Sequence, residues 1–546
     1  MKINLKLDLF QFLSQESPKQ FKRLIGFSVL LGLTNTILIA AINAAAKDVT
    51  NGESVTMQFF LFILLISLFL FFARRSNREN IHNSRDIIYR FRIRIMRDVF
   101  RSSLSRIDEI GRHHIIEVMA RDTQMVSQAI VVVVTMFQSI ATLAFLTIYL
   151  ATVSMMAFFI ILVASIIIVL VGVSIFTTVT GRLSEVSKDE VRLNALYADY
   201  LNGYKEIKMH SRRAYGMTQD LIGQTKAINN ETTKVIISLT NFFNYLQVLL
   251  YVIVGTMVFV VPVVVSDFAS SVTTATTTAL FLAGSLAGII TSIPHLSQAN
   301  VAARTLRELA TDLEQASEPE YAEAPGTYDD VGSIRLDNVS YQHGGQSTSS
   351  RFMLGPVSYT FEKGKVYFIR GNNGSGKTTL MRVLIGLYRP SQGQIEVNDQ
   401  AISLPASSQY RDIFSVVFSD FFLFKKLYGL MISSPEETER LLDLFKIKHK
   451  VSIVNGEFSD LQFSTGQRKR IALIVALLEK RQFLVLDEWA ADQDPEFRRE
   501  FYQEIIPAIR NMGKTIIAIT HDDRYYEMAD HVLHMVDGKL LVNQES

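Results

Sequence analysis

One stretch of sequence decides the fold of the C-terminal part of the chain: Gly371-Asn372-Asn373-Gly374-Ser375-Gly376-Lys377-Thr378-Thr379. It follows a short apolar β-type run and precedes a helical pattern, which is the context in which G-x-x-x-x-G-K-[ST] binds phosphate. The glycines let backbone N–H groups close around phosphate oxygens at a helix N-terminus. Lys377 supplies a positive charge for the β- and γ-phosphates, and the Thr378 hydroxyl is placed to ligate Mg²⁺. The stretch predicts a site for a nucleoside triphosphate.

An acidic motif lies further along the chain. Residues 483–486 read Phe-Leu-Val-Leu, which is typical of a buried parallel strand, and Asp487 and Glu488 follow at its carboxyl end. Ligands bind at this edge of such sheets. Asp487 can hold the Mg²⁺ shell, and Glu488 is then placed to polarise the attacking water. Together with the phosphate loop, this pair predicts nucleotide hydrolysis.

A second anion site is predicted at the start of the helix over residues 468–479, which opens with Phe463-Ser464-Thr465-Gly466-Gln467. Its N–H groups and the Ser464 hydroxyl can donate hydrogen bonds to a phosphate. One chain cannot easily aim two helix termini at one triphosphate, which suggests that a second copy supplies this one.

Two further candidates follow the strands of the same part of the chain. Asp494 ends the segment Ala491-Asp492-Gln493-Asp494, which comes after the acidic strand. His521 follows an apolar strand over residues 516–520. A histidine at a strand end beside two phosphate motifs is expected to contact the γ-phosphate.

The N-terminal part has a different character, because long apolar runs alternate there with arginine-rich stretches up to about residue 305. A membrane helix needs about 20 largely apolar residues. Six runs qualify as spans: residues 24–45, 57–72, 129–150, 155–177, 245–265 and 279–293. The second and sixth are short and are expected to extend into polar residues.

Basic residues predict the orientation of these spans. They gather in residues 1–23 and in the long loops 74–123 and 182–234, which are therefore expected in the cytoplasm together with both termini. Residues 1–23 read as an amphipathic segment on the inner membrane surface. The alternative is a secretory signal with a small-residue cleavage site near residues 40–46, which would leave five spans.

Composition removes several classes of protein. The 546 residues carry a net charge of +2, which gives no support to nucleic-acid binding driven by bulk charge. The absence of cysteine excludes a disulfide scaffold, a thiolate zinc site and an iron–sulfur cluster. Residues 316–330, rich in Glu, Ala and Pro, read as a linker. The expected domains are residues 24–310 and 331–546, joined by residues 311–330.

Taken in order, the phosphate loop, Phe463–Gln467, Leu484–Glu488, Asp494 and His521 resemble the ATPase domain of ABC transporters. The six spans with two long inner loops resemble the exporter type as a half-transporter, so the resemblance covers essentially the whole chain. It implies a six-helix α transmembrane domain followed by an α/β P-loop ATPase domain, in a bacterial inner membrane. It also implies a homodimer that sandwiches two ATPs, each between one phosphate loop and the other copy's Ser464-Thr465-Gly466-Gln467 signature. The inner loops would carry coupling helices, one near residues 207–217.

Departures from the family pattern narrow the branch. The usual L-S-G-G-Q is Phe463-Ser464-Thr465-Gly466-Gln467, Asp-Glu-Pro becomes Asp487-Glu488-Trp489, and Ser419 stands where a glutamine is expected. These features, with Asn-Gly-Tyr-Lys-Glu-Ile-Lys over residues 202–208, resemble the cyclic-peptide exporter branch. That branch includes exporters of pyoverdine-type siderophore precursors, syringomycin-like lipopeptides and lasso peptides.

The resemblance leaves two site residues open. The metal shell could be completed by the Ser419 hydroxyl, by Asp420 or by water. The aromatic residue that stacks on adenine falls on His343, with Tyr341 as the other option.

The leading hypothesis is an ATP-driven homodimeric exporter of a cyclic or modified peptide or a siderophore precursor. One alternative is a membrane regulator that binds ATP without hydrolysis, although the presence of Glu488 and His521 favours an enzyme. Another is a lipid flippase or an importer on the same scaffold. Neutral polar residues within the spans, such as Asn43 and Asn241, could bond a neighbouring helix or line a cavity for an uncharged or amphipathic solute.

Overall fold

The computed structural model describes residues 8–264, 272–315, 330–342, 352–402, 408–430 and 435–542. The chain divides into two compact units, which are described separately. The first contains Met1–Val99 and Ile110–Gln315, and the second contains Phe100–Glu109 and Ala316–Ser546. Residues 100–109, which the sequence places in the first long inner loop, therefore group with the C-terminal unit, where Leu104 packs against a core cluster.

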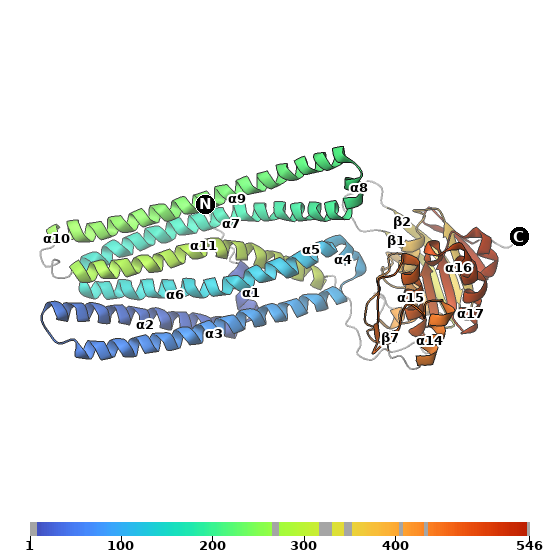
Figure 1. The fold of residues 1–546 in the computed structure, drawn as a ribbon, viewed down its shortest axis with the longest axis horizontal. Helices are drawn as coiled ribbons and strands as arrows, with labels where there is room; N and C mark the ends of the chain where they lie inside the picture. Colours follow the sequence, from blue (N-terminus) through green and yellow to red (C-terminus); the bar gives the residue numbers. More distant parts are fainter. Residues whose placement is uncertain are drawn as a thin grey trace. The chain divides into compact units, whose positions relative to one another are not determined.

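Within the described residues of the first unit, six helices are long and apolar enough to cross a membrane, which confirms the six predicted spans. Figure 1 shows them running alongside one another. They are α2 (Pro18–Thr50), α3 (Thr56–Arg101), α6 (Thr123–Val153) with its extension through α5 (Arg112–Glu117) and η1 (Val118–Asp122), α7 (Met155–Asn202), α9 (Ser211–Gly255) with its extension through η2 (Thr256–Val260) and α10 (Val261–Val264), and α11 (Val272–Gln315).

These helices are much longer than a membrane is thick. The 48 residues of α7 span roughly 70 Å at about 1.5 Å per residue, against about 30 Å of hydrocarbon. The helices therefore continue well beyond the apolar runs. The long loops that the sequence predicts consist largely of these helical extensions. In the second of these loops, the short helix α8 (Tyr204–Lys208) joins α7 to α9.

Close contacts hold the bundle together. A Cβ on Gly32 of α2 would lie 2.7 Å from the Cβ of Ala141 on α6, so glycine is needed where these helices meet. Asn43 of α2 donates to the Thr278 hydroxyl at 3.2 Å and accepts from the Thr277 hydroxyl at 2.8 Å, both on α11. Asn43 thus bonds a neighbouring helix, which is one of the two roles expected for a neutral polar residue within a span.

The N-terminal amphipathic segment forms the short helix α1 (Asp8–Glu16) within the described residues. Its apolar side chains Leu9, Phe12 and Leu13 are buried, and the rings of Phe12 and Phe91 of α3 lie 5.3 Å apart. The Leu9 N–H donates to the Asn300 side chain of α11 at 3.1 Å. The apolar face of α1 therefore packs against the helix bundle, whereas the sequence suggests that it lies on the membrane surface.

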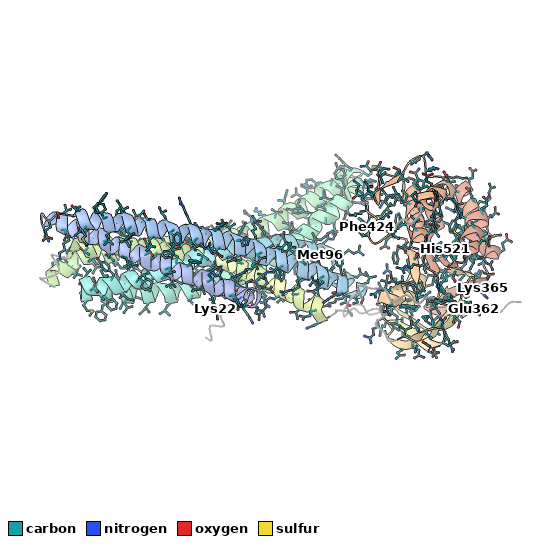
Figure 2. All side chains as sticks on the ribbon, turned by 90° about the horizontal axis from the view of Figure 1, so that it is seen from below. Lys22, Met96, Glu362, Lys365, Phe424 and His521 are labelled. Carbon is teal, nitrogen blue, oxygen red and sulfur yellow. The ribbon has the colours of Figure 1, made fainter. Side chains whose placement is uncertain are left out.

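The second unit is built on a six-stranded sheet in the order β12-β11-β3-β10-β9-β6, in which only β12 runs antiparallel to its neighbour. The strands are β3 (Val366–Gly371), β6 (Phe414–Val417), β9 (Phe483–Asp487), β10 (Thr515–Ile519), β11 (His531–Val536) and β12 (Lys539–Val542). Lys365 precedes β3 at the amino end of the parallel strands, whereas His521 follows β10 at their carboxyl end; Figure 2 labels both residues.

Alternation along the strands gives each face of the sheet its own core. Phe368, Leu486 and Ile516 contribute to one core, on the side of α15 (Thr465–Leu478), while Ile369 and Val485 contribute to the other. The second core also packs against the antiparallel sheet β2-β1-β4-β5 and α12 (Lys377–Leu384). The remaining elements are α4 (Leu104–Ile110), β1 (Ser333–Gln342), β2 (Met353–Glu362), β4 (Gln392–Val397), β5 (Gln400–Ala401), α13 (Ser408–Arg411), α14 (Pro435–Leu444), β7 (Ile453–Val454), β8 (Glu457–Phe458), η4 (Trp489–Asp492), α16 (Pro495–Glu500), η5 (Phe501–Ile505), α17 (Ile506–Asn511) and η6 (Asp523–Met528).

Candidate functional site

Four parallel strands bring the predicted site residues to one edge of the sheet. The strand β3 leads into the phosphate loop, β6 is followed by Ser419, β9 ends at Asp487, and β10 is followed by His521. Because β3, β10, β9 and β6 are neighbours and all run in the same direction, their carboxyl ends share this edge. This is the edge at which open α/β sheets bind their ligands.

The phosphate loop has the backbone that a phosphate cradle requires. Gly376 caps α12 in the left-handed conformation, with φ +100°, and a Cβ there would lie 2.6 Å from the Phe352 ring. Only glycine fits such a position without strain. Ser375 within the loop is buried, and its hydroxyl has no hydrogen-bond partner among the described residues. The open donors of the loop therefore fit a phosphate group.

Lys377 lies against this loop. Its ammonium donates to the carbonyls of Gly371 at 2.8 Å and Asn372 at 3.1 Å, and the residue is only 6% exposed. Burial lowers the pKa of Lys377, while the carboxylates of Glu488 and Asp487 act in the opposite direction. The buried ammonium of Lys377 thus lies near the two carboxylates and the phosphate loop. A bound phosphate would replace the water that this ammonium has lost.

Lys377→Ala is expected to weaken ATP binding by about 10–100-fold, because a charge-assisted hydrogen bond to phosphate contributes about 1.5–3 kcal/mol. The measurement is equilibrium binding of a fluorescent ATP analogue to the purified full-length protein. Lys363→Ala is the matched control, since Lys363 lies before β3 and pairs with Asp330. Equal affinity in Lys377→Ala and the control would show that Lys377 does not contact the nucleotide.

Asp487 has the environment of a metal ligand. It is 1% exposed, accepts from the Ser419 hydroxyl at 3.0 Å through Oδ2, and has no partner for Oδ1 among the described residues. Burial raises the pKa of Asp487, the Ser419 hydroxyl lowers it, and the neighbouring Glu488 raises it. A buried carboxylate oxygen without a partner fits a hard cation such as Mg²⁺.

Ser419 therefore reaches the site through Asp487, to which it donates a hydrogen bond. Asp420, the other candidate from the sequence, is exposed, as is Ser419 itself. The structure thus brings Ser419 and Asp487 together, and a direct bond from either Ser419 or Asp420 to a metal remains a prediction.

Glu488 and His521 form the next pair. Glu488 Oε1 lies 3.3 Å from His521 Nε2. The segment around His521 is anchored by the buried Tyr502, whose hydroxyl lies 2.6 Å from the Thr520 hydroxyl and donates to Asp522 at 2.9 Å. A carboxylate and an imidazole held at hydrogen-bond distance can orient a water molecule beside a γ-phosphate.

The signature segment forms the start of α15. Ser464 caps this helix, accepting from the Gln467 N–H at 3.4 Å, and the Gln467 side chain accepts from the Ser464 N–H at 3.4 Å. Ser464 and Thr465 are exposed. The start of this helix is therefore accessible from solvent at Ser464 and Thr465, as a site for an anion held by a second molecule requires.

Asp494 lies between α15 and α16. One carboxylate oxygen accepts from the Phe497 N–H at 2.8 Å and the other from Arg470 at 2.9 Å. The hydrogen bond from the Phe497 N–H holds the pKa of Asp494 below its usual range; burial acts in the opposite direction, and the charge of Arg470 lowers the pKa further. Asp494 is therefore a helix cap bonded to α15, and its predicted contact with ATP remains a prediction.

The candidates for adenine stacking are separated by the structure. Tyr341 is buried, and its ring stacks on Tyr388 with centroids 4.9 Å apart. Burial raises the pKa of Tyr341 to about 12. A ring packed in this way cannot present an open face to a base, so Tyr341 does not suit the role. His343, the other candidate, lies outside the described residues.

Trp489 and Lys469 are site residues that the sequence analysis missed. Trp489, the departure after Asp487-Glu488, is 1% exposed and packs on Phe501 with ring centroids 4.3 Å apart. Lys469 is buried on α15 and donates to the Glu488 carbonyl at 2.8 Å. The spacing of Lys469 from the buried Leu473 and Ala476 is helical, so a lysine on the apolar face of this helix was visible in the sequence.

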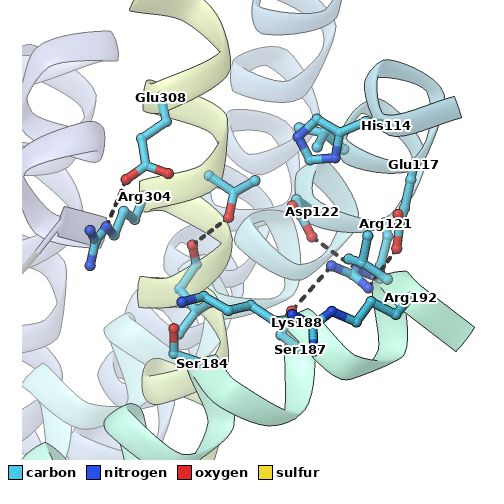
Figure 3. Close-up of a pocket in the computed structure, with 14 residues that line it drawn as sticks. His114, Glu117, Arg121, Asp122, Ser184, Ser187, Lys188, Arg192, Arg304 and Glu308 are labelled. Atoms are coloured by element: carbon cyan, nitrogen blue, oxygen red, sulfur yellow. Dashed lines mark hydrogen bonds and ion pairs between the residues drawn. The ribbon is translucent and has the colours of Figure 1, made fainter. Parts of the chain in front are cut away.

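The first unit contains a cavity of about 510 Å³ beside η1, α7 and α11 (Figure 3). Arg121 of η1 lies there and donates to Glu117 at 2.8 Å, to Asp122 at 3.0 Å and to Ser187 of α7 at 3.3 Å. The bond to Ser187 joins η1 to α7 beside the cavity. The neutral polar residues that the sequence places within the spans do not line it.

Comparison with known proteins extends the similarity over both units. The family model described as ABC transporter matches residues 354–491. The ATP-binding protein SyrD of Pseudomonas syringae pv. syringae is 30% identical over 525 residues, which is 94% of this chain and 93% of that protein. The nisin transport ATP-binding protein NisT of Lactococcus lactis subsp. lactis is 30% identical over 227 residues, 38% of this chain and 37% of that protein.

A solved structure gives the same fold. The structure of a bacterial Atm1-family ABC exporter with ATP bound has a TM-score of 0.75 to this chain at 18% identity, covering 97% of this chain and 95% of that one. The expected fold class, six apolar helices followed by an α/β P-loop domain, is confirmed.

Proposed function

This chain belongs to the ABC transporter family, and we propose that it exports a peptide-like compound as a homodimer with two composite ATP sites. The chain is a multi-pass membrane protein whose ATPase domain couples ATP hydrolysis to transport. The proposal concerns the substrate, the partner and the roles of individual residues.

One observation carries the catalytic part of the proposal. Ser419, the pair Asp487 and Glu488, and His521 all lie at or just after the carboxyl ends of strands, at the edge where the phosphate loop lies. In the proposed reaction Lys377 binds the phosphates, and Glu488, oriented by His521, polarises the attacking water. Thr378 and Asp487 would hold Mg²⁺, which neutralises charge on the phosphates when it is bound.

The homodimer is proposed from the position of the signature. The Ser464 hydroxyl lies at the exposed start of α15, whereas the phosphate loop precedes α12, a different helix of the same unit. A second copy, placed head to tail, would bring its Ser464 to the nucleotide held by Lys377 of the first copy.

The substrate class is proposed from the departures at Ser419, Thr465 and Trp489, which resemble the cyclic-peptide exporter branch. The match to SyrD over 94% of the chain and to a protein named for nisin transport is in keeping with this branch. We propose a cyclic or modified peptide or a siderophore precursor, moved out of a bacterial cell across its inner membrane. The ATPase domain and both termini would lie in the cytoplasm.

The test is transport into liposomes that carry the protein with its ATPase domain outside. We expect ATP-dependent accumulation of a labelled cyclic lipopeptide or siderophore peptide in the lumen, absent in a Glu488→Gln control. ATP-dependent movement of a labelled phospholipid without peptide uptake would instead identify a flippase. ATP binding without hydrolysis would identify a regulator and overturn the proposal.

Ser419→Ala is expected to leave ATP binding nearly unchanged but to raise the Mg²⁺ concentration for half-maximal hydrolysis by about 2–10-fold, because one hydrogen bond to Asp487 is lost. The bond lowers the pKa of Asp487, so its loss raises that pKa and moves the acidic limb of the pH–rate profile to higher pH. We expect coupled transport to fall more than ATP binding. Ser419→Gln should be tolerated. A profile and Mg²⁺ dependence identical to the wild type would show that Ser419 has no part in the site.

A further inference from the structure

A buried lysine joins the signature helix to the catalytic segment. The Lys469 side chain is 3% exposed, and its ammonium lies 2.7 Å from Asp492 Oδ2 and donates to the Glu488 carbonyl at 2.8 Å. Both partners lie in the segment that follows β9. An ammonium removed from water in this way binds its partners firmly, because each bond replaces lost hydration.

Three more hydrogen bonds join the same two segments. The Trp489 indole N–H donates to the Lys469 carbonyl at 2.8 Å, and the Gln493 amide donates to the Gly466 carbonyl at 3.1 Å. Arg470 donates to the Gln493 side chain at 2.9 Å. We call this set of contacts the clasp; its members are Gly466, Lys469 and Arg470 on α15 and Glu488, Trp489, Asp492 and Gln493 after β9.

The two segments joined by the clasp are also closely packed. A Cβ on Gly466, within the signature itself, would lie 2.7 Å from the Asp492 carbonyl oxygen. The start of α15 is therefore in close contact with the segment after β9, and a displacement of one must move the other.

Glu488 depends on this support. Its backbone is left-handed, with φ +48° and ψ +40°, a conformation that costs energy for a residue other than glycine. It is held on one side by its N–H, which donates to the Ile519 carbonyl at 3.1 Å, and on the other by Lys469, which bonds its carbonyl. Lys469 thus restrains the backbone that directs the Glu488 carboxylate toward His521.

We propose that Lys469 is a positioning residue that couples the signature helix of each chain to the catalytic Glu488 of the same chain. The inference rests on the composite homodimer proposed above. In that dimer α15 of one chain contacts the nucleotide at one site, while Glu488 of the same chain acts at the other site. Engagement of a nucleotide by Ser464 is therefore transmitted through the clasp to hydrolysis at the opposite site.

The chain carries its own reporter for this coupling. Trp489 is the single tryptophan of the sequence, it is 1% exposed, and it is bonded to α15 through the Lys469 carbonyl. A change in the packing of α15 against β9 alters the surroundings of this one indole. Its intrinsic fluorescence therefore reports the clasp in the full-length protein without any label.

The first experiment follows Trp489 emission on addition of ATP and Mg²⁺ to the full-length Glu488→Gln protein in detergent. We expect a saturable change in emission, which is abolished by Ser464→Arg although a fluorescent ATP analogue still binds with unchanged affinity. A change of the same size in the Ser464→Arg protein would overturn the coupling, because it would show that Trp489 senses only nucleotide bound by its own chain.

The second experiment replaces the ammonium. Lys469→Met, which keeps an unbranched stem as far as Cε and removes the ammonium, should lower kcat by about 10–100-fold with KM within about twofold, because Glu488 is misplaced while nucleotide binding is retained. The ATP response of Trp489 should shrink in parallel. Lys469→Gln, one bond shorter but still a donor, should recover part of kcat.

Lys446→Met is the matched control, because Lys446 is an exposed lysine of the same unit that pairs with Glu500 at 2.6 Å. A Lys469→Met protein with wild-type kcat and an unchanged Trp489 response would overturn the proposal. If the wild type itself hydrolyses no ATP, the proposed function fails; if the wild type is active and Lys469→Met is indistinguishable from it, this inference alone fails. Should Lys469→Met lose nucleotide binding, the proposal is tested by Lys469→Gln and by Ser464→Arg instead. A wild-type kcat in Lys469→Gln together with an undiminished Trp489 response in Ser464→Arg would overturn it.

Discussion

Glu488→Gln is expected to lower the ATPase rate by at least about 10²-fold, the usual contribution of a general base, while ATP binding stays at the wild-type level. The amide keeps the shape of the side chain but cannot accept a proton from water. Binding is retained because Lys377 and the phosphate loop, which hold the phosphates, are untouched. The measurements are phosphate release and equilibrium binding of a fluorescent ATP analogue.

Glu496→Gln is a suitable control for this variant, since Glu496 is an exposed carboxylate on α16 of the same unit. Its rate should equal that of the wild type. Loss of nucleotide binding in Glu488→Gln equal to its loss of activity would show that Glu488 has a binding role and that the general base lies elsewhere.

Ser464→Arg is expected to abolish closure of the ATP-bound dimer and to lower hydrolysis by at least about tenfold, which corresponds to only about 1.4 kcal/mol. The substitution removes the cap of α15 and places a bulky cation at the positive end of the helix, where the γ-phosphate of the partner would lie. Nucleotide affinity of each chain should stay nearly intact, because Lys377 is on a different helix.

Crosslinking across the dimer with ATP and Mg²⁺ measures this closure. Ser464→Thr, which keeps a hydroxyl at the cap, should close normally and serves as the control. Normal closure in Ser464→Arg would contradict the composite site.

The parts of the site that depend on local sequence could be predicted well. The phosphate loop is a local structure, since the spacing of Gly371, Gly376 and Lys377 determines the turn, the helix start and the position of the charge. The acidic strand could be predicted for a similar reason: four consecutive apolar residues before Asp487 indicate a fully buried parallel strand.

Contacts between distant segments could not be predicted in the same way. The stacking of Tyr341 on Tyr388 depends on how β1 packs, and nothing in the residues around Tyr341 reveals its partner. Likewise, Ser419 reaches Asp487 only because β6 and β9 are neighbours in the sheet. Strand order is a property of the whole fold, so the sequence predicted the edge but not this bond.

Lys469 is a different case, because the sequence itself carries a signal for its pairing. A lysine on the buried face of α15 is costly unless it is paired, and its partners had to be carboxylates or carbonyls nearby. In the membrane unit, the apolar runs predicted the six spans, but the positions at which the helices end depend on residues beyond the runs. The paired residues of α1 and α11 are almost three hundred residues apart, which explains why the packing of α1 was not predicted.

The most direct test of the central claim, two ATP sites each shared between two chains, combines two defective variants in one dimer. Lys377→Ala and Ser464→Arg chains are given different affinity tags, co-expressed, and purified as the mixed dimer for comparison with each parent homodimer. In a shared-site dimer the two defects fall on the same site, and the other site keeps an intact phosphate loop and signature, so the mixed dimer should hydrolyse ATP above both parents. Its rate should stay below that of one wild-type site, because Glu488 of the intact site belongs to the Ser464→Arg chain, whose α15 engages no nucleotide. If each chain built its site from its own phosphate loop and signature, every site would carry a defect, and a mixed dimer as inactive as its parents would contradict the account.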